Sequence, residues 1–213
     1  MSPELPRLIV ITDWSLGTAR LLRALSRVVA LGSRVAVQHR HPDASTREFL
    51  DEARQLRALC DPAGVPLFVN GRLDVALLLD AHLHVPAHGT RVADARALMP
   101  KDRWISAAVH DEQEADASRG ADLVLVSPVF GAGSKPDDLR APLGRDRFDA
   151  LASRMDCAAY ALGGISPATV EQLHSSCAHG VASVTGVLTA SDPGAAAREL
   201  LDSFELQRLR RQL

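Results

Sequence analysis

Short apolar stretches rich in β-branched residues recur along the chain, and longer amphipathic stretches separate them. The apolar stretches lie at 8–12, 34–38, 66–69, 83–85, 104–109, 123–126, 158–162 and 180–184. Nearly continuous apolar character is typical of strands that are buried on both faces of a parallel sheet. The pattern therefore predicts eight parallel strands that alternate with helices.

The stretches between the strands carry apolar residues three or four positions apart. One such stripe consists of Leu21, Leu25, Val28 and Val29, and a second consists of Phe49, Leu50, Ala53, Leu56 and Leu59. This spacing places apolar side chains on one side of a helix, where they can pack against a sheet. Ser166 and Pro167 predict a further helix that begins directly after Ile165, because serine caps helix N-termini and proline suits the first helical position.

This order of elements indicates an α/β fold, and we predict a single (β/α)8 TIM-barrel domain over residues 1–213. No Pro/Gly/Ser-rich linker and no internal repeat divides the chain. An open, doubly wound parallel sheet is the alternative, since strands and helices alternate in that fold as well. The basic tail, at about 205–213, is expected to be the solvated end of a last helix.

Composition and charge limit the classes of function. The chain has 24 Lys and Arg against 26 Asp and Glu, so its net charge of -2 provides no basic field for nucleic acid. A membrane-spanning apolar run and a signal peptide are both missing, so we expect a soluble, cytoplasmic protein. Cys60, Cys157 and Cys177 are odd in number and widely spaced, which favours buried thiols over disulfides or zinc ligands. The oligomeric state is left open, and a homo-oligomer is compatible with the sequence.

Two loops predict a site for a phosphorylated small molecule. Gly163 and Gly164 follow the seventh predicted strand, and Val184 and Thr185 close the eighth. In (β/α)8 barrels a phosphate often binds at the loops after the last two strands, and glycine lets backbone N–H groups approach an anion closely. The alternative is that the glycines only form a tight turn.

Cationic side chains suggest where further phosphate charge would bind. The loop at 127–137 is long and contains Lys135, which predicts a lid that can neutralise a phosphate. After the second strand, Gln38 and Arg40 should point to one side and His39 and His41 to the other. Arg40 would enter the barrel mouth and contact a phosphate or form an internal ion pair. We interpret His39 and His41 as surface residues rather than metal ligands.

Three more polar residues stand at or near strand ends. Asn70 follows the third strand and is expected either to fix a polar ring of a substrate or to bond the loop backbone. His84 lies in the fourth strand, where structural burial is favoured over catalysis. His110 follows the fifth strand. An imidazole that is neutral near pH 7 suits a general base, so His84 and His110 are also candidates for an isomerase.

The ordered motifs of the chain resemble the thiamine phosphate synthase and thiazole tautomerase superfamily, whose members are (β/α)8 barrels. The likeness runs from about residue 8 to residue 197. Its matching segments are 9–13 (IVITD), 37–40 (VQHR), 69–74 (VNGRLD), 109–110 (VH), 120–122 (GAD), 127–130 (SPVF), 134–136 (SKP), 142–144 (PLG) and 162–165 (LGGI).

The resemblance implies an enzyme of thiamine biosynthesis. In the synthase, aminopyrimidine diphosphate ionises to a carbocation and diphosphate, and the nitrogen of thiazole phosphate captures the cation; Mg²⁺ and basic residues hold the diphosphate. By resemblance the diphosphate contacts Gln38, Arg40 and Lys135, and Asn70 contacts pyrimidine or diphosphate, with Ser134 in the same substrate-binding set. The thiazole phosphate contacts the backbone near Gly163, Gly164, Val184 and Thr185. The implied catalytic candidates are Arg40 and Lys135, beside the histidines His84 and His110.

The chain also departs from the family pattern. Gly71 and the segment 86–89 (PAHG) stand where the resemblance places two acidic magnesium ligands, so no metal ligand is predicted. The family motif after strand two is Gln-x-Arg-x-Lys, and this chain ends the motif with His41 and Pro42, so the lysine is missing. Ala108 replaces a serine that precedes the strand-five histidine in the family. Pro128 stands where the tautomerase branch has its proton-transferring histidine. Losing the metal carboxylates should cost several kcal/mol of transition-state stabilisation.

The sequence therefore leaves three candidate functions. The first is a divergent synthase, which needs Mg²⁺ if its activity is retained. The second is a non-catalytic binder of thiamine phosphate or thiazole phosphate. The third is a tautomerase-like isomerase that uses His84 or His110 as a general base.

Overall fold

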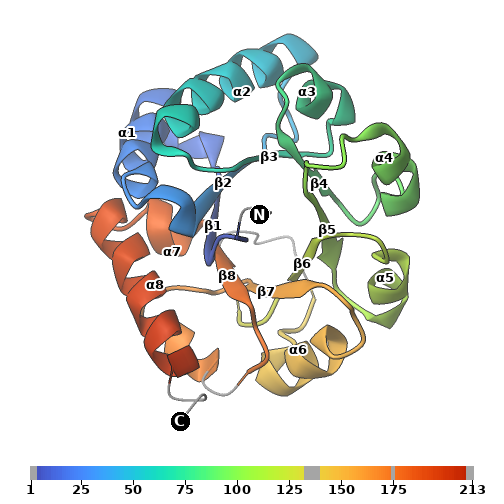
Figure 1. Cartoon of the computed structure of the whole chain (residues 1–213). Coiled ribbons are helices and arrows are strands. Elements are labelled where there is room, and N and C mark those ends of the chain that lie inside the picture. The colour runs from blue at the N-terminus through green and yellow to red at the C-terminus, as the bar shows by residue number, and fades with distance from the viewer. Residues whose placement is uncertain (1–3, 132–139, 174–175, 210–213) are drawn as a thin grey trace.

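The computed structural model describes residues 4–131, 140–173 and 176–209. Its eight strands pair in parallel, each with the next in the sequence, and β1 also pairs with β8, so the sheet closes into a barrel. Figure 1 shows the strands as a central ring with the helices outside it. The predicted (β/α)8 barrel is confirmed, and the open doubly wound sheet is excluded because no edge strand is left. The strands are β1 (Leu8–Ile11), β2 (Val35–His39), β3 (Leu67–Asn70), β4 (His82–Val85), β5 (Ile105–Val109), β6 (Leu123–Val126), β7 (Ala158–Leu162) and β8 (Gly180–Ser183).

Helices connect consecutive strands and cover the outside of the barrel. The apolar stripes predicted from the sequence are the inner faces of α1 and α2, and helix α8 packs beside α1 (Figure 1). None of the described helices is both long and apolar enough to span a membrane. The helices are α1 (Thr18–Val29), α2 (Thr46–Cys60), α3 (Leu73–Leu78), α4 (Val92–Leu98), α5 (Glu112–Ala117), α6 (Gly144–Ala152), α7 (Thr185–Leu188) and α8 (Pro193–Leu209), with short 3-10 turns η1 (Trp14–Leu16), η2 (Gly32–Arg34), η3 (Asp61–Ala63) and η4 (Val170–Leu173).

Two apolar layers form the core, because alternate residues of each strand face opposite sides of the barrel wall. The outer layer lies between strands and helices and contains most of the buried residues. The inner layer fills the barrel itself and consists of Ile9, Ile11, Ala36, Phe68, Leu123, Leu125, Tyr160 and Ala182. These side chains close the barrel from within, so a ligand can enter only above them, at the carboxyl ends of the strands.

One expectation about the helices is wrong, and the expectation of buried thiols holds only in part. The helix predicted directly after Ile165 is a turn followed by η4, because the Ser166 N–H donates to Thr169 Oγ1 (2.9 Å), which in turn donates to the Gly164 carbonyl (2.6 Å). These side-chain bonds compete with a helical start. Among the cysteines, Cys60 is buried, and burial raises the pKa of its thiol to about 12, but Cys177 is exposed. Cys177 lies in the irregular segment before β8, where its backbone N–H donates to Asp149 of the helix at 144–152 (2.8 Å) while the residue stays exposed.

Candidate active site at the barrel mouth

Gln38 is a buried polar side chain at the upper end of the barrel interior. It pairs in register with Ile11 on β1 and Phe68 on β3, which both belong to the inner layer, so its side chain faces the same interior. The residue is 2% exposed, and its Oε1 atom has no hydrogen-bond partner in the described structure. A buried carbonyl oxygen without a partner loses its bonds to water, which costs about 1–3 kcal/mol. A bound ligand that donates a hydrogen bond would remove this cost.

Arg40 follows β2, and its backbone is fixed to β1. The Arg40 N–H donates to Thr12 Oγ1 (2.8 Å), and the Thr12 hydroxyl donates to the Arg40 carbonyl (3.1 Å). The Arg40 side chain is half-buried, and no carboxylate of the described residues forms an ion pair with it. The internal ion pair that the sequence left open is therefore not found within that part of the chain. The guanidinium is available to bind an anion.

Asn70 ends β3 on the same interior side, since it pairs in register with His84 on β4. Hydrogen bonds from the described residues to the Asn70 side chain are absent, so the alternative in which it bonds the loop backbone is not supported. Its half-buried amide can both donate and accept at the mouth.

His84 and Ser106 lie side by side on β4 and β5, and both are more buried than Asn70. The distance from His84 Nδ1 to Ser106 Oγ is 2.9 Å, and both residues are buried. This satisfied buried pair agrees with the structural interpretation of His84. His110 instead lies in the loop after β5, half-buried, where its Nδ1 is 2.6 Å from Glu114 Oε2 on α5. Because a carboxylate accepts hydrogen bonds, Glu114 fixes a proton on Nδ1 and sets the orientation of the ring.

A cavity of 220 Å³ lies between the loops after β7 and β8. Its lining includes all four residues predicted to hold a phosphate, Gly163, Gly164, Val184 and Thr185. The backbone N–H groups of Gly164, Thr185 and Gly186 have no acceptor among the described residues. Amides of two separate loops thus surround one small cavity, which suits an anion with several oxygens.

Close backbone packing explains the glycines in these loops. Gly164 has φ 64°, and a Cβ atom there would lie 2.7 Å from the Gly131 carbonyl oxygen; at Gly186 it would lie 2.2 Å from the Ile165 carbonyl oxygen. The Ser183 hydroxyl also donates to that Ile165 carbonyl (2.8 Å). The glycines therefore form the tight turn that was the alternative to a phosphate site. The same packing shapes the cavity, so the two interpretations are compatible.

Ser134 and Lys135 lie outside the described residues. Their predicted contacts with substrate, and the lid at 127–137, stay predictions from the sequence.

The interpretation of His39 as a surface residue is wrong. Strand residues that point away from the barrel interior meet the helix layer, and His39 is fully buried there between Trp14 and Phe49. Trp14 Nε1–H donates to His39 Nδ1 (3.2 Å), and the Phe49 carbonyl accepts from Nε2–H (3.1 Å). These bonds define a neutral imidazole, and burial lowers the pKa of His39 to about 4.

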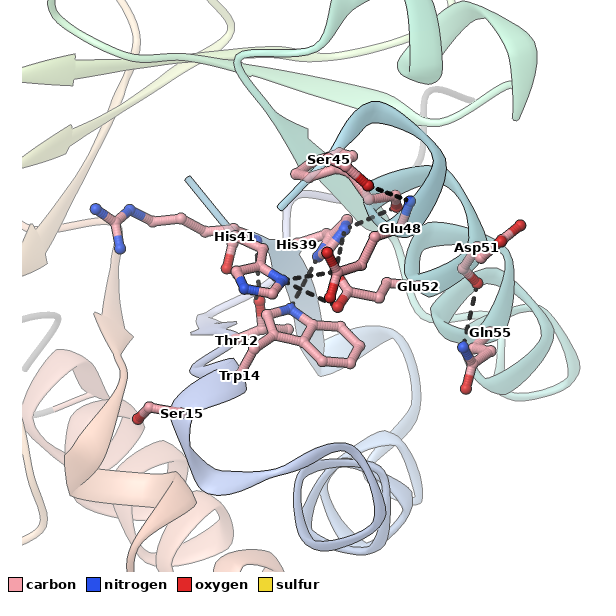
Figure 2. Close-up of polar contacts among 12 residues, drawn as sticks. Thr12, Trp14, Ser15, His39, His41, Ser45, Glu48, Asp51, Glu52 and Gln55 are labelled. Atoms are coloured by element: carbon pink, nitrogen blue, oxygen red, sulfur yellow. Dashed lines mark hydrogen bonds and ion pairs between the residues drawn. The ribbon is translucent and has the colours of Figure 1, made fainter. Parts of the chain in front are cut away.

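His41 is half-buried rather than fully at the surface, and it belongs to a group that the sequence analysis missed. Its Nδ1 lies 2.9 and 3.0 Å from the two carboxylate oxygens of Glu52 on α2 (Figure 2). Burial raises the pKa of Glu52, and the bond to His41 opposes that change. Glu48, one turn earlier on α2, completes the group. The only signal in the sequence was the four-residue spacing of the two glutamates.

Comparisons with known proteins agree with the geometry. The family model described as thiamine monophosphate synthase matches residues 8–187. A thiamine-phosphate synthase from Chloroflexus aurantiacus is 40% identical over 91% of this chain and 90% of its own length, and one from Xanthobacter autotrophicus is 36% identical over 91% and 92%. Both relatives are named thiamine-phosphate synthase, an activity that belongs to the transferases.

Among solved structures, thiamine phosphate pyrophosphorylase from Pyrococcus furiosus superposes with a TM-score of 0.81 at 25% identity, covering 94% of this chain and 96% of that one. A 3-hexulose-6-phosphate synthase, at 16% identity and a TM-score of 0.66, shares the fold alone. With the family model matching most of the sequence and two relatives above 30% identity over nine-tenths of it, the chain belongs to the thiamine monophosphate synthase family.

Proposed function

We propose that the protein is a transferase of the thiamine-phosphate synthase type that acts in thiamine biosynthesis. In this reaction the bond between the methylene carbon of aminopyrimidine diphosphate and the diphosphate breaks, and the nitrogen of thiazole phosphate bonds to that carbon. Thiamine phosphate and diphosphate are released. The observation that carries the proposal is the cavity at the loops after β7 and β8, in a chain that matches the family over residues 8–187.

The thiazole phosphate binds in that cavity, where the amides of Gly164, Thr185 and Gly186 donate to its oxygens. The aminopyrimidine diphosphate binds on the opposite side of the mouth. Gln38 offers an acceptor and a donor there, so its amide can accept from the pyrimidine amino group and donate to a phosphate oxygen. Arg40 holds the diphosphate, and its charge favours departure of this leaving group.

His84 and His110 are not needed as bases for this reaction. Capture of a carbocation by the thiazole nitrogen forms one C–N bond and moves no proton. Both imidazoles already have a partner, Ser106 for His84 and Glu114 for His110. They serve in this proposal as positioning residues that shape the mouth.

Mg²⁺ is implied by the family, but the residues at its expected position do not fit the ion. Gly71 lies at φ 70° with its α-carbon facing Pro86, and a Cβ atom there would lie 3.5 Å from the Pro86 ring. Pro86 to Gly89 form a tight turn closed by a 2.9 Å bond from the Gly89 N–H to the Pro86 carbonyl, and the turn contains no carboxylate. We infer that the acidic magnesium ligands have been lost and that Arg40, together with Lys135, must offset the diphosphate charge.

The misfit favours a second candidate, a non-catalytic binder of thiamine phosphate or thiazole phosphate. Incubation of the purified protein with aminopyrimidine diphosphate, thiazole phosphate and Mg²⁺, followed by chromatography, separates the two. The synthase requires thiamine phosphate well above the uncatalysed background, and its absence would reject that activity. Calorimetric binding of thiamine phosphate without turnover would then support the binder, whereas no binding would reject both.

Arg40→Gln should lower the rate of a synthase at least tenfold, because it removes the cation beside the leaving group. Arg47→Gln changes an exposed arginine of α2 and is the matched control, expected to keep the rate. Equal rates of the two variants would contradict the role of Arg40.

A further inference from the structure

A second cluster of potential ligands lies outside the barrel interior, between the loop after β2 and helix α2. Figure 2 shows His41 of the loop beside Glu48 and Glu52 of the helix. One ligand atom from each of the three lies within 4.8 Å of the other two. Glu48 and Glu52 are four residues apart on α2, which places both carboxylates on one side of the helix.

The charges in this cluster do not balance. Lysine and arginine side chains of the described residues form no ion pair with either carboxylate, and His41 supplies at most one positive charge against two negative ones. The side chain of Glu52 is only 9% exposed, so water compensates little of its charge. His39, at 3.5 Å from Glu52, cannot act as a counter-ion because both of its ring nitrogens are engaged as a neutral imidazole.

The Glu48 side chain also does not form the helix cap that its spacing from Ser45 would suggest. Ser45 and Glu48 have the spacing of a capping box, in which the serine accepts from the backbone of residue 48 and the glutamate accepts from the backbone of residue 45. Only the first half is formed, with the Glu48 N–H donating to Ser45 Oγ at 3.3 Å. The Glu48 carboxylate instead lies with His41 and Glu52, where a like charge is unfavourable unless a cation joins them.

We propose that His41, Glu48 and Glu52 bind a divalent transition-metal ion. One imidazole and two carboxylates suit Zn²⁺ and Mn²⁺, which take nitrogen and oxygen ligands at about 2.0–2.2 Å. The Nδ1 and carboxylate oxygens of His41 and Glu52 are 2.9 and 3.0 Å apart, a separation that two neighbouring ligands of one ion can have. Glu48 is exposed, and its ligand atom lies within 4.8 Å of those of His41 and Glu52. The ion ties the loop that carries Arg40 to helix α2.

The test is metal binding to the full chain, without any assay of activity. Chelator-treated protein is titrated with ZnCl2 by calorimetry and with MnCl2 by the loss of the free Mn²⁺ resonance signal. We expect one ion per chain and a higher melting temperature with metal. Glu48→Gln, which alters an exposed side chain and leaves the fold intact, should weaken binding at least tenfold, and His41→Gln should do the same.

Asp51→Asn is the matched control, because Asp51 is an exposed carboxylate on the same helix that pairs with Arg54. It should bind metal as the unmodified protein does. Failure of the unmodified protein to bind either ion, or equal binding by Glu48→Gln and Asp51→Asn, would overturn the proposal. The second result would mean that the metal binds elsewhere, for example at the exposed thiol of Cys177.

Discussion

At the scale of single residues, Gln38 and Ser106 are both buried polar side chains of the barrel interior, but only Ser106 has a partner. We predict that Gln38→Leu leaves the free energy of unfolding unchanged or raises it by about 1 kcal/mol, since it removes an unpaired buried carbonyl. The same change should weaken binding of aminopyrimidine diphosphate at least tenfold. Urea unfolding and calorimetry measure the two effects.

Ser106→Ala is the control for this comparison. It removes the hydrogen bond between Ser106 and buried His84 and should therefore lower the free energy of unfolding by about 1–3 kcal/mol. If Gln38→Leu is as unstable as Ser106→Ala, the Gln38 amide is part of the folding core rather than a ligand contact.

At the scale of elements, the period of two along β2 correctly predicted which side chains share a side. Gln38 faces the interior, and His39 faces the opposite side, as the alternation predicts. The error was to equate the outer side with solvent, because in a parallel barrel the helices bury that side as well. The helix predicted after Ile165 does not form because the Thr169 side chain makes local hydrogen bonds to the turn. The group of His41 with Glu52 joins a loop to a helix, and no local pattern encodes such a contact.

The contact between the loops after β7 and β8 gives a prediction for these elements. Gly186→Ala should lower the free energy of unfolding by about 1–3 kcal/mol, because its Cβ atom would overlap the Ile165 carbonyl, which is backbone and cannot rotate away. It should also weaken calorimetric binding of thiazole phosphate at least tenfold. Gly131→Ala is the control, since Gly131 lines the same cavity but its Cβ atom would meet no atom of the described residues within 4 Å. Normal binding by Gly186→Ala would show that the phosphate does not use this cavity.

At the scale of the whole molecule, the residues proposed to bind ligands lie at the carboxyl ends of the strands, and an aromatic stack lies toward the opposite end. His82, the first residue of β4, stacks on Trp104 with ring centroids 4.5 Å apart and lies 5.0 Å from the Phe68 ring. Its Nδ1 accepts a hydrogen bond from the backbone N–H of Trp104 at 2.9 Å, so the imidazole ring is neutral. Such a division, with function at one end and stability at the other, is usual for (β/α)8 barrels.

The stack therefore links stability to pH. Burial is the main reason why the pKa of His82 falls from 6.5 to about 4. The positive charges of Arg103 and Arg57 also lower this pKa, and the negative charges of Asp80 and Asp102 raise it. The unfolded chain takes up a proton at His82 as the pH falls below 6.5, whereas the folded chain does so only near pH 4. The free energy of unfolding should thus decrease between these values, by roughly 3 kcal/mol in total from this residue.

His82→Asn keeps an acceptor for the Trp104 N–H but removes the titrating ring. Urea unfolding from pH 7 to pH 4.5 should show a smaller loss of stability for this variant than for the unmodified protein, by roughly 2 kcal/mol. His88→Asn is the control and should retain the full loss, because His88 is exposed and meets solvent in both states. An identical pH dependence for all three proteins would mean that His82 is protonated in the folded barrel. The aromatic stack would then tolerate a charge, and a neutral His82 ring would not be what stabilises this end of the molecule.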